Sequence, residues 1–183
     1  MKQAISGYST ALGILCLALI LLPSGRALGQ GQSPIVNFVS AGGPDIQDTD
    51  YPGSRPGYDK NYSLVAIRYA DGTASGELID RWASGVLPGT TALRADIDCV
   101  HVVGNTAWVS GVVTQGTYID ADGTIDLTGW YVRTRVQDNG ANSDPTDPDK
   151  IAFSQVRSSA PFPCANMFQS TFWDMPGGQV VVR

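Results

Sequence analysis

The chain has 183 residues, of which 12 are basic and 17 acidic, so its formal net charge is −5. An acidic balance of this kind argues against nucleic acid and anionic membrane surfaces as partners. Every acidic residue except Glu77 is Asp. Since Asp favours turns and caps whereas Glu favours helices, the composition also points away from a helical protein.

The N-terminus has the three zones of a secretory signal. Lys2 is the only early charge, an apolar stretch of 12 residues follows at Ala11–Leu22, and a small-residue zone ends at Gly29. Twelve apolar residues fall short of the ~20 needed to cross a bilayer, so we predict a cleavable signal peptide at 1–29 and no permanent membrane anchor. The protein is then secreted or periplasmic.

The remainder is long enough for one domain, which we divide into an N-terminal strand with a polar loop (30–61) and a main part (62–183). Short β-rich segments alternate there with Gly, Asp, Asn and Pro, and no long segment has helical periodicity. A Gly- and Pro-rich polar loop is expected at 42–61. The predicted strands are Ile35–Val39, Tyr62–Ala70, Thr73–Trp82, Thr91–Val103, Ala107–Thr114, Thr128–Gln137, Lys150–Val156, Met167–Trp173 and Gln179–Val182.

The strand at Thr91–Val103 has the clearest alternation of apolar and polar residues. Its pattern places His101 and Cys99 on the buried face with Leu93, and Asp96 and Asp98 on the polar face. Period-two patterning of this kind is typical of a half-buried strand. In the strand at Thr128–Gln137 the same rule puts Trp130 in the core and leaves Tyr131, Arg133 and Arg135 on a face that is either solvated or built from cation–π contacts.

About eight short strands separated by turn signals predict an all-β fold, a single antiparallel barrel or sandwich. Two cysteines remain after Cys16 leaves with the signal peptide. Cys99 and Cys164 would then lie in an oxidising compartment, where one intramolecular disulfide is favoured over two free thiols.

Several phrases resemble a family of secreted bacterial β-rich domains to which no activity is assigned. They are the hairpin DGTASGEL (Asp71–Leu78), the strand pair CVHVVGNTAWVSGV (Cys99–Val112), the loop VQDNG (Val136–Gly140) and the late Cys164. The resemblance covers most of residues 62–165. It implies an extracytoplasmic β module with a Cys99–Cys164 bridge, and it implies nothing about function. The loop at 42–61 has no counterpart in it.

The sequence offers one candidate metal site, for calcium. Asp120, Asp122 and Asp126 form a D-x-D-G pattern on a Gly-containing loop, and hard cations prefer several oxygen ligands. The EF-hand pattern fails, because its first and last ligand positions would fall on Tyr118 and Gly129. The alternative is a Gly turn capped by Asp side chains. Two other acidic segments, 45–50 and 138–149, are typical of solvated loops.

The sequence gives little support for a catalytic function. The single histidine, His101, lacks a free nucleophile beside it, so a structural role is favoured over a triad. A glycosidase needs two carboxylates facing one cleft. The carboxylates that neighbouring strands could bring together are Glu77, Asp80, Asp96 and Asp98.

The aromatic residues offer a binding alternative. Trp82, Trp108, Tyr131 and Trp173 could form a sugar-stacking surface or line the mouth of a barrel, although aromatics in strands more often fill the core. We therefore expect a non-enzymatic extracytoplasmic binding or structural module with an unassigned ligand or protein partner, which calcium could stabilise. The alternatives are a β-barrel that binds a carbohydrate or a small apolar ligand, and a carboxylate-dependent hydrolase.

Overall fold

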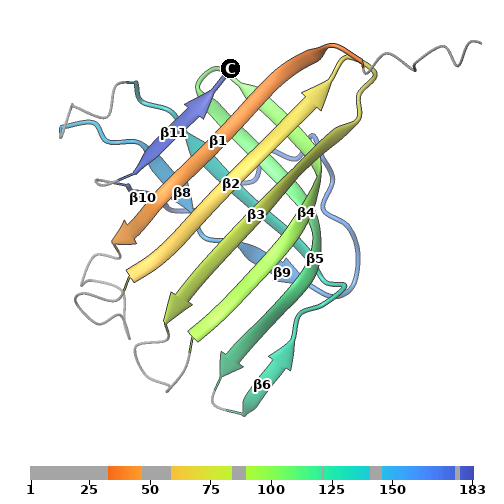
Figure 1. The fold of residues 1–183 in the computed structure, drawn as a ribbon, viewed down its shortest axis with the longest axis vertical. Helices are drawn as coiled ribbons and strands as arrows, with labels where there is room; N and C mark the ends of the chain where they lie inside the picture. Colours follow the sequence, from red (N-terminus) through yellow and green to blue (C-terminus); the bar gives the residue numbers. More distant parts are fainter. Residues whose placement is uncertain (1–32, 47–58, 84–89, 121, 141–145, 176–177) are drawn as a thin grey trace, which may run out of the picture. The chain divides into compact units, whose positions relative to one another are not determined.

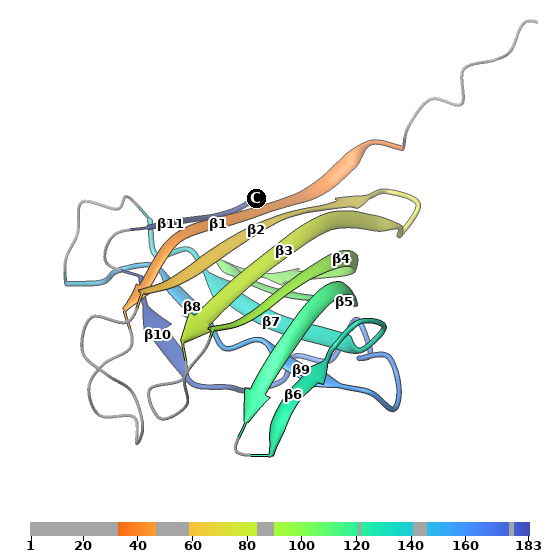
Figure 2. The same ribbon diagram turned by 60° about the horizontal axis from the view of Figure 1, so that its bottom comes forward.

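Eleven β-strands form one antiparallel sheet that curls over on itself (Figures 1 and 2). The computed structural model describes residues 33–46, 59–83, 90–120, 122–140, 146–175 and 178–183. These residues belong to one compact unit, Ser33–Arg183. The predicted signal peptide lies outside the described residues. The described part of the chain contains no helix of the length and hydrophobicity needed to cross a bilayer.

The first five strands are long and carry most of the sheet, and the last six are short. The strands are β1 (Ile35–Ile46), β2 (Asp59–Tyr69), β3 (Ala74–Ala83), β4 (Thr90–Val103), β5 (Thr106–Asp120), β6 (Gly123–Asp126), β7 (Tyr131–Gln137), β8 (Lys150–Ala152), β9 (Gln155–Arg157), β10 (Phe172–Asp174) and β11 (Gln179–Val182). Along the sheet their order is β10-β8-β7-β5-β4-β3-β2-β1-β11, with β6 beside β5 and β9 beside β7.

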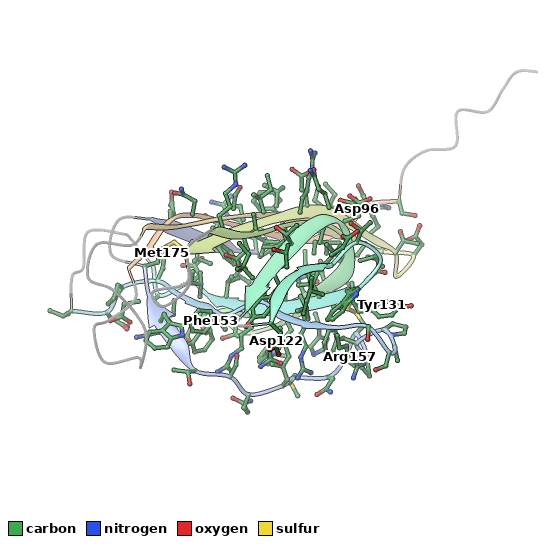
Figure 3. All side chains as sticks on the ribbon, turned by 90° about the horizontal axis from the view of Figure 1, so that it is seen from below. Asp96, Asp122, Tyr131, Phe153, Arg157 and Met175 are labelled. Atoms are coloured by element: carbon green, nitrogen blue, oxygen red, sulfur yellow. A yellow bond between two sulfur atoms is a disulfide. The ribbon has the colours of Figure 1, made fainter. Side chains whose placement is uncertain are left out.

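The curl brings the two ends of the sheet toward each other. In Figure 2, β7, β8 and β9 pass beneath the arm made of β1, β2 and β3, and in Figure 3 side chains fill the space between the two arms. The all-β prediction is therefore confirmed. The molecule contains one continuous barrel-like sheet, and a two-sheet sandwich is excluded for the described residues.

The structure differs from the expected strands in several places. The predicted strand Met167–Trp173 is strand only from Phe172, in β10, because residues 167–171 are irregular and cross the outer face of the sheet. The segment predicted as a loop at 42–61 is β-strand at both ends, because β1 and β2 stay paired from Gly42↔Ser63 to Ile46↔Asp59. The expected strand at 150–156 is two strands, β8 and β9, which pair with different parts of β7. Strand β6 was not predicted, and it extends the hairpin that β5 begins.

The inner face of the curled sheet holds the hydrophobic core. Gly76 and Gly111 let neighbouring strands approach each other closely. A Cβ on Gly76 would overlap the Val65 carbonyl, and a Cβ on Gly111 would overlap the Asp96 carbonyl. A glycine inside strand β3 is thus explained by the close approach of the neighbouring backbone. The core side chains that are almost fully buried include Val39, Leu64, Leu78, Val100, Val109, Val113, Leu127, Val132, Val136, Ile151, Met175 and Val180.

One polar link crosses the interior. The Tyr62 hydroxyl on β2 donates a hydrogen bond to the Thr134 hydroxyl on β7 (3.2 Å), which in turn donates to the Ala152 carbonyl on β8 (2.7 Å). Buried hydroxyls of this kind are tolerated only when they are hydrogen-bonded. The link joins strands that lie on opposite arms of the curl.

A β-bulge at Asp98 corrects the predicted faces of β4. The register steps from Ile97↔Gly111 to Cys99↔Ser110, so Asp98 is the extra residue. A bulge of one residue reverses the faces of all that follow. Val100 therefore enters the core, whereas Cys99 and His101 lie on the outer face, where His101 is opposite Trp108 with ring centroids 6.2 Å apart. The prediction that His101 and Cys99 face the core was wrong.

The outer face of β4, β5 and β7 is covered by an irregular segment that we call the strap (residues 158–171), which connects β9 to β10. The disulfide Cys99–Cys164 joins the strap to β4, which confirms the predicted pairing. The Trp108 indole on β5 donates a hydrogen bond to the Phe168 carbonyl of the strap (3.0 Å). The strap makes β5 a strand that is buried on both faces from Ala107 to Gly111.

Three arginines on β7 and β9 hold the strap through aromatic rings and carbonyl groups. Arg133 lies over Phe162 and Phe168, at 4.5 and 4.0 Å from the ring centroids, and Arg157 over Phe162 at 4.1 Å. Arg135, 7% exposed, lies 3.9 Å over Phe172 and donates hydrogen bonds to Gln169 and to the Ser170 carbonyl. Of the two alternatives for this face, the structure has the cation–π one.

Two aspartates link the two ends of the curled sheet. The Asp149 carboxylate, 3% exposed, accepts hydrogen bonds from the backbone N–H of Val180 on β11 (2.6 Å) and of Asn139 (2.9 Å). The Asp138 carboxylate accepts one from Val182 on β11 (3.0 Å). Because alternate N–H groups of an edge strand point away from the sheet, the two carboxylates take the place of a neighbouring strand.

We expect removal of the disulfide to destabilise the domain without changing its sheet. The Cys99→Ala/Cys164→Ala variant should lose roughly 2–4 kcal/mol of unfolding free energy, because the bridge restricts the unfolded chain over 65 residues. Urea unfolding followed by tryptophan fluorescence measures this loss. The wild type in reductant is the control and should show the same shift, and an unchanged midpoint in both would contradict a stabilising role.

We expect Asp149→Asn to destabilise the closure of the sheet. An amide has only one acceptor oxygen, so one of the two buried N–H groups loses its partner, at a cost of roughly 1–3 kcal/mol. The control is Asp174→Asn, which removes an exposed partner of Lys150 (3.0 Å) and should cost less than about 1 kcal/mol. Equal effects of the two substitutions on urea unfolding would show that Asp149 does not close the sheet.

Candidate binding groove

The described residues form a groove of about 530 Å³ on β3, β4, β5 and β6. Its volume is within the ~300–1,000 Å³ typical of small-molecule sites. The described lining combines charged, polar and apolar side chains. It consists of Ile79, Arg81, Ala92, Leu93, Arg94, Gln115, Gly116, Thr117, Asp126 and Thr128.

The strand register explains why these residues meet. Arg81, Ala92 and Thr117 are cross-strand neighbours, and Thr117 is in turn opposite Asp126. A parallel row is formed by Ile79, Arg94 and Gln115. Residues opposite each other in a ladder share a face, so both rows project from the side of the sheet away from the core.

A second bulge, in β5 at Thr114, shapes the groove. The register steps from Arg94↔Gln115 to Ala95↔Val113, and the hydroxyl of the bulged Thr114 donates to the Arg94 carbonyl (3.2 Å). Bulges increase local twist and redirect side chains. Beyond this bulge β5 leaves β7, which pairs with it only as far as Val112, and continues with β6.

The charged side chains of the groove differ in whether they have a partner within the domain. The Arg94 guanidinium is held by Glu77, whose carboxylate accepts from its Nε (2.6 Å) and forms an ion pair with its terminal nitrogen. The Arg81 side chain has no ion pair or hydrogen bond within the described part of the chain. Asp126 is engaged by Thr128, and hydrogen bonds from the Thr128 side chain and backbone lower the pKa of that carboxyl group.

The residues predicted to bind calcium lie on the β5–β6 hairpin. The Asp120 backbone pairs with Gly123, Asp122 is in the turn, and Asp126 pairs with Thr117, three steps or roughly 10 Å farther along the strand. Among the described side chains, which do not include that of Asp120, no three potential ligands gather in one place. Calcium binding by this loop stays a prediction.

The aromatic residues proposed to face a ligand are dispersed over the sheet. Trp108 is buried under the strap, Trp173 packs edge-on against Phe153 with centroids 5.4 Å apart, and Tyr131 is opposite Arg157 at one end of β7 (Figure 3). Trp82 belongs to β3, but its side chain lies outside the described residues. Trp130 packs against the core as expected. The described groove lining contains neither Trp nor Tyr.

The carboxylates considered for a hydrolase lie on different faces of the sheet. Glu77 and Asp96 are opposite each other on the outer face, whereas Asp80 is buried and shares the inner face with Leu78. Asp98 lies at the β4 bulge, where desolvation raises its pKa. Asp126 is the one carboxylate in the described groove lining. The arrangement suits binding better than a reaction that needs two carboxylates in one cleft.

Sequence reasoning missed the residues that line the groove. Arg81, Ala92, Arg94 and Gln115 belong to strands that were predicted, but their meeting depends on the register between β3, β4 and β5 and on the bulge at Thr114. No local motif encodes that register. The one available signal was the presence of Arg81 and Arg94 at outward positions of two consecutive strands.

Comparisons of the chain with protein-family models, with curated proteins and with solved structures gave no match.

The raised pKa of Asp98 predicts a pH-dependent effect of its removal. A carboxyl group whose folded-state pKa is raised contributes stability below its unfolded pKa of about 3.9 and loses that contribution as pH rises through the folded value. Asp98→Asn should therefore raise unfolding free energy at pH 7 relative to the wild type, with the gain vanishing near pH 3. Urea unfolding at both values measures this.

The control for that prediction is Asp96→Asn, which removes the same charge two residues earlier on β4. If the two variants respond alike at pH 7, the effect comes from net charge and the local desolvation of Asp98 plays no part.

Proposed function

We propose that this protein is a secreted or periplasmic, non-enzymatic binding module whose ligand occupies the groove on β3, β4, β5 and β6. The observation that carries the proposal is the groove itself, about 530 Å³ in volume and lined by polar groups that the rest of the domain does not use. The side chains of Arg81, Gln115 and Thr117 have no hydrogen-bond or ion-pair partner within the described residues. Their donors and acceptors are available to a ligand.

The disulfide and the N-terminal sequence support the location. A Cys99–Cys164 bridge is consistent with an oxidising compartment outside the cytoplasm. The apolar stretch at Ala11–Leu22 supports export by a signal peptide. The resemblance to secreted bacterial β-rich domains agrees with both.

The side chains in the groove and in the core favour a groove that binds a polar ligand over an apolar-ligand barrel and over a hydrolase. An apolar ligand inside the curl would need the space that the core side chains of β1–β5 and β7 occupy. A two-carboxylate hydrolase would need a second acid near Asp126 in the groove. A surface groove of mixed polarity supports a polar ligand that makes several hydrogen bonds at once.

The proposal is tested by blocking the groove. Ala92 lies between Arg81 and Thr117 on the outer face, so Ala92→Phe should fill the groove without entering the core. We expect the wild type to bind members of a soluble oligosaccharide panel, seen as a rise in melting temperature, and Ala92→Phe to lose that response.

The matched control is Val65→Phe, an equally bulky change at an exposed position of β2 that is not part of the described lining. It should keep the wild-type response. A response that survives in Ala92→Phe, or that disappears equally in both variants, would overturn the assignment of the groove as the binding site.

A further inference from the structure

We infer that the groove recognises an acidic saccharide, a hydroxylated ring that bears a carboxylate, and that Arg81 binds the carboxylate. This inference rests on the proposed function of the groove. It specifies the class of ligand and the residue that selects it.

The groove offers an unpaired positive charge although the whole chain is acidic, with a net charge of −5. The described lining contains two arginines and one carboxylate, Asp126, and Glu77 outside the lining is paired with Arg94. Asp126 accepts a hydrogen bond from the Thr128 backbone N–H (2.8 Å). Arg81 is therefore the lining cation without an ion pair among the described side chains, and an unpaired guanidinium attracts an anionic group.

The two arginines have different roles in this arrangement. Glu77 fixes the Arg94 guanidinium from outside the lining through a hydrogen bond and an ion pair. Arg81 is exposed and carries an uncompensated guanidinium whose planar N–H groups match a carboxylate in bidentate geometry. Arg81 is thus the residue free to pair with a ligand.

The neutral lining suits hydroxyl groups. The Gln115 amide and the Thr117 hydroxyl both donate and accept, as sugar hydroxyls do, and both belong to β5 within two residues of each other. Ile79 and Ala92 supply a small apolar surface between the polar groups, which fits the C–H face of a sugar ring. This combination favours a saccharide over a simple carboxylic acid.

A peptide is disfavoured as the ligand. Extended peptides bind β-proteins chiefly by adding a strand to an open edge. Across the floor of the groove, β3 pairs with β2 and β4, β4 with β3 and β5, and β5 with β4 and β6. The groove strand with one partner is β6, which is only four residues long. The backbone groups of the floor are used within the sheet, so recognition there comes from side chains.

The test compares two matched oligosaccharide series, oligogalacturonates and neutral galactose oligomers of equal length, by isothermal titration with the full mature domain. We expect the acidic series to bind more tightly, with an affinity that falls as ionic strength rises. Arg81→Gln should weaken acidic binding by roughly ten- to hundredfold, the range for a charged hydrogen-bonded pair, and should leave neutral binding unchanged.

Arg68→Gln is the control, because it removes the same charge from β2 outside the described lining, and it should bind like the wild type. Equal affinity for both series, abolished by Ala92→Phe, would overturn the acidic preference while the groove remains the site. Binding of neither series, or binding that Ala92→Phe does not affect, would overturn the groove as the binding site as well.

Discussion

The closure of the curled sheet depends on a small set of hydrogen bonds between two aspartates and the edge of β11. A sheet that curls must either complete its ladder or leave a row of unpaired N–H and C=O groups. Here Asp138 and Asp149 accept the outward N–H groups of Val182 and Val180 across the seam. These hydrogen bonds join the two ends of the curled sheet around the core, and the groove lies on the outer face of β3, β4 and β5.

The strap covers the outer face of a part of the sheet that has apolar residues on both faces. From Ala107 to Gly111, β5 is buried on both sides, with the core on one and the strap on the other. Arg133, Arg135 and Arg157 have no carboxylate partner among the described residues, and aromatic faces and carbonyl groups stabilise them instead. The disulfide adds a covalent tie at Cys99. The strap covers the outer face of β4, β5 and β7, whereas the groove on β3, β4, β5 and β6 lies outside it.

The fold class could be predicted because alternation, turn residues and the Asp-rich composition are local signals. The Cys99–Cys164 bridge followed from a count of cysteines. The faces of His101 and Cys99 were wrong because a one-residue bulge at Asp98 reverses a pattern that looks continuous in sequence. The closing role of Asp149 and the groove around Arg81 depend on contacts between residues far apart in the chain. Such contacts produce no repeating pattern in the sequence. Individual strands could therefore be predicted, whereas the contacts between distant strands could not.

The pairing of β1 with β11 has a consequence for the order of assembly. Strand β1 can complete its pairing only when β11 is present, because the outer edge of Val39–Gly42 pairs with Gln179–Val182. Strands β2 to β5 can form as a local meander before the rest of the chain has folded, whereas the edge of β1 remains open until the C-terminal strand is in place. The domain therefore combines fast local pairing with one late, long-range step, and the time between the two is when it is most exposed to association with other chains.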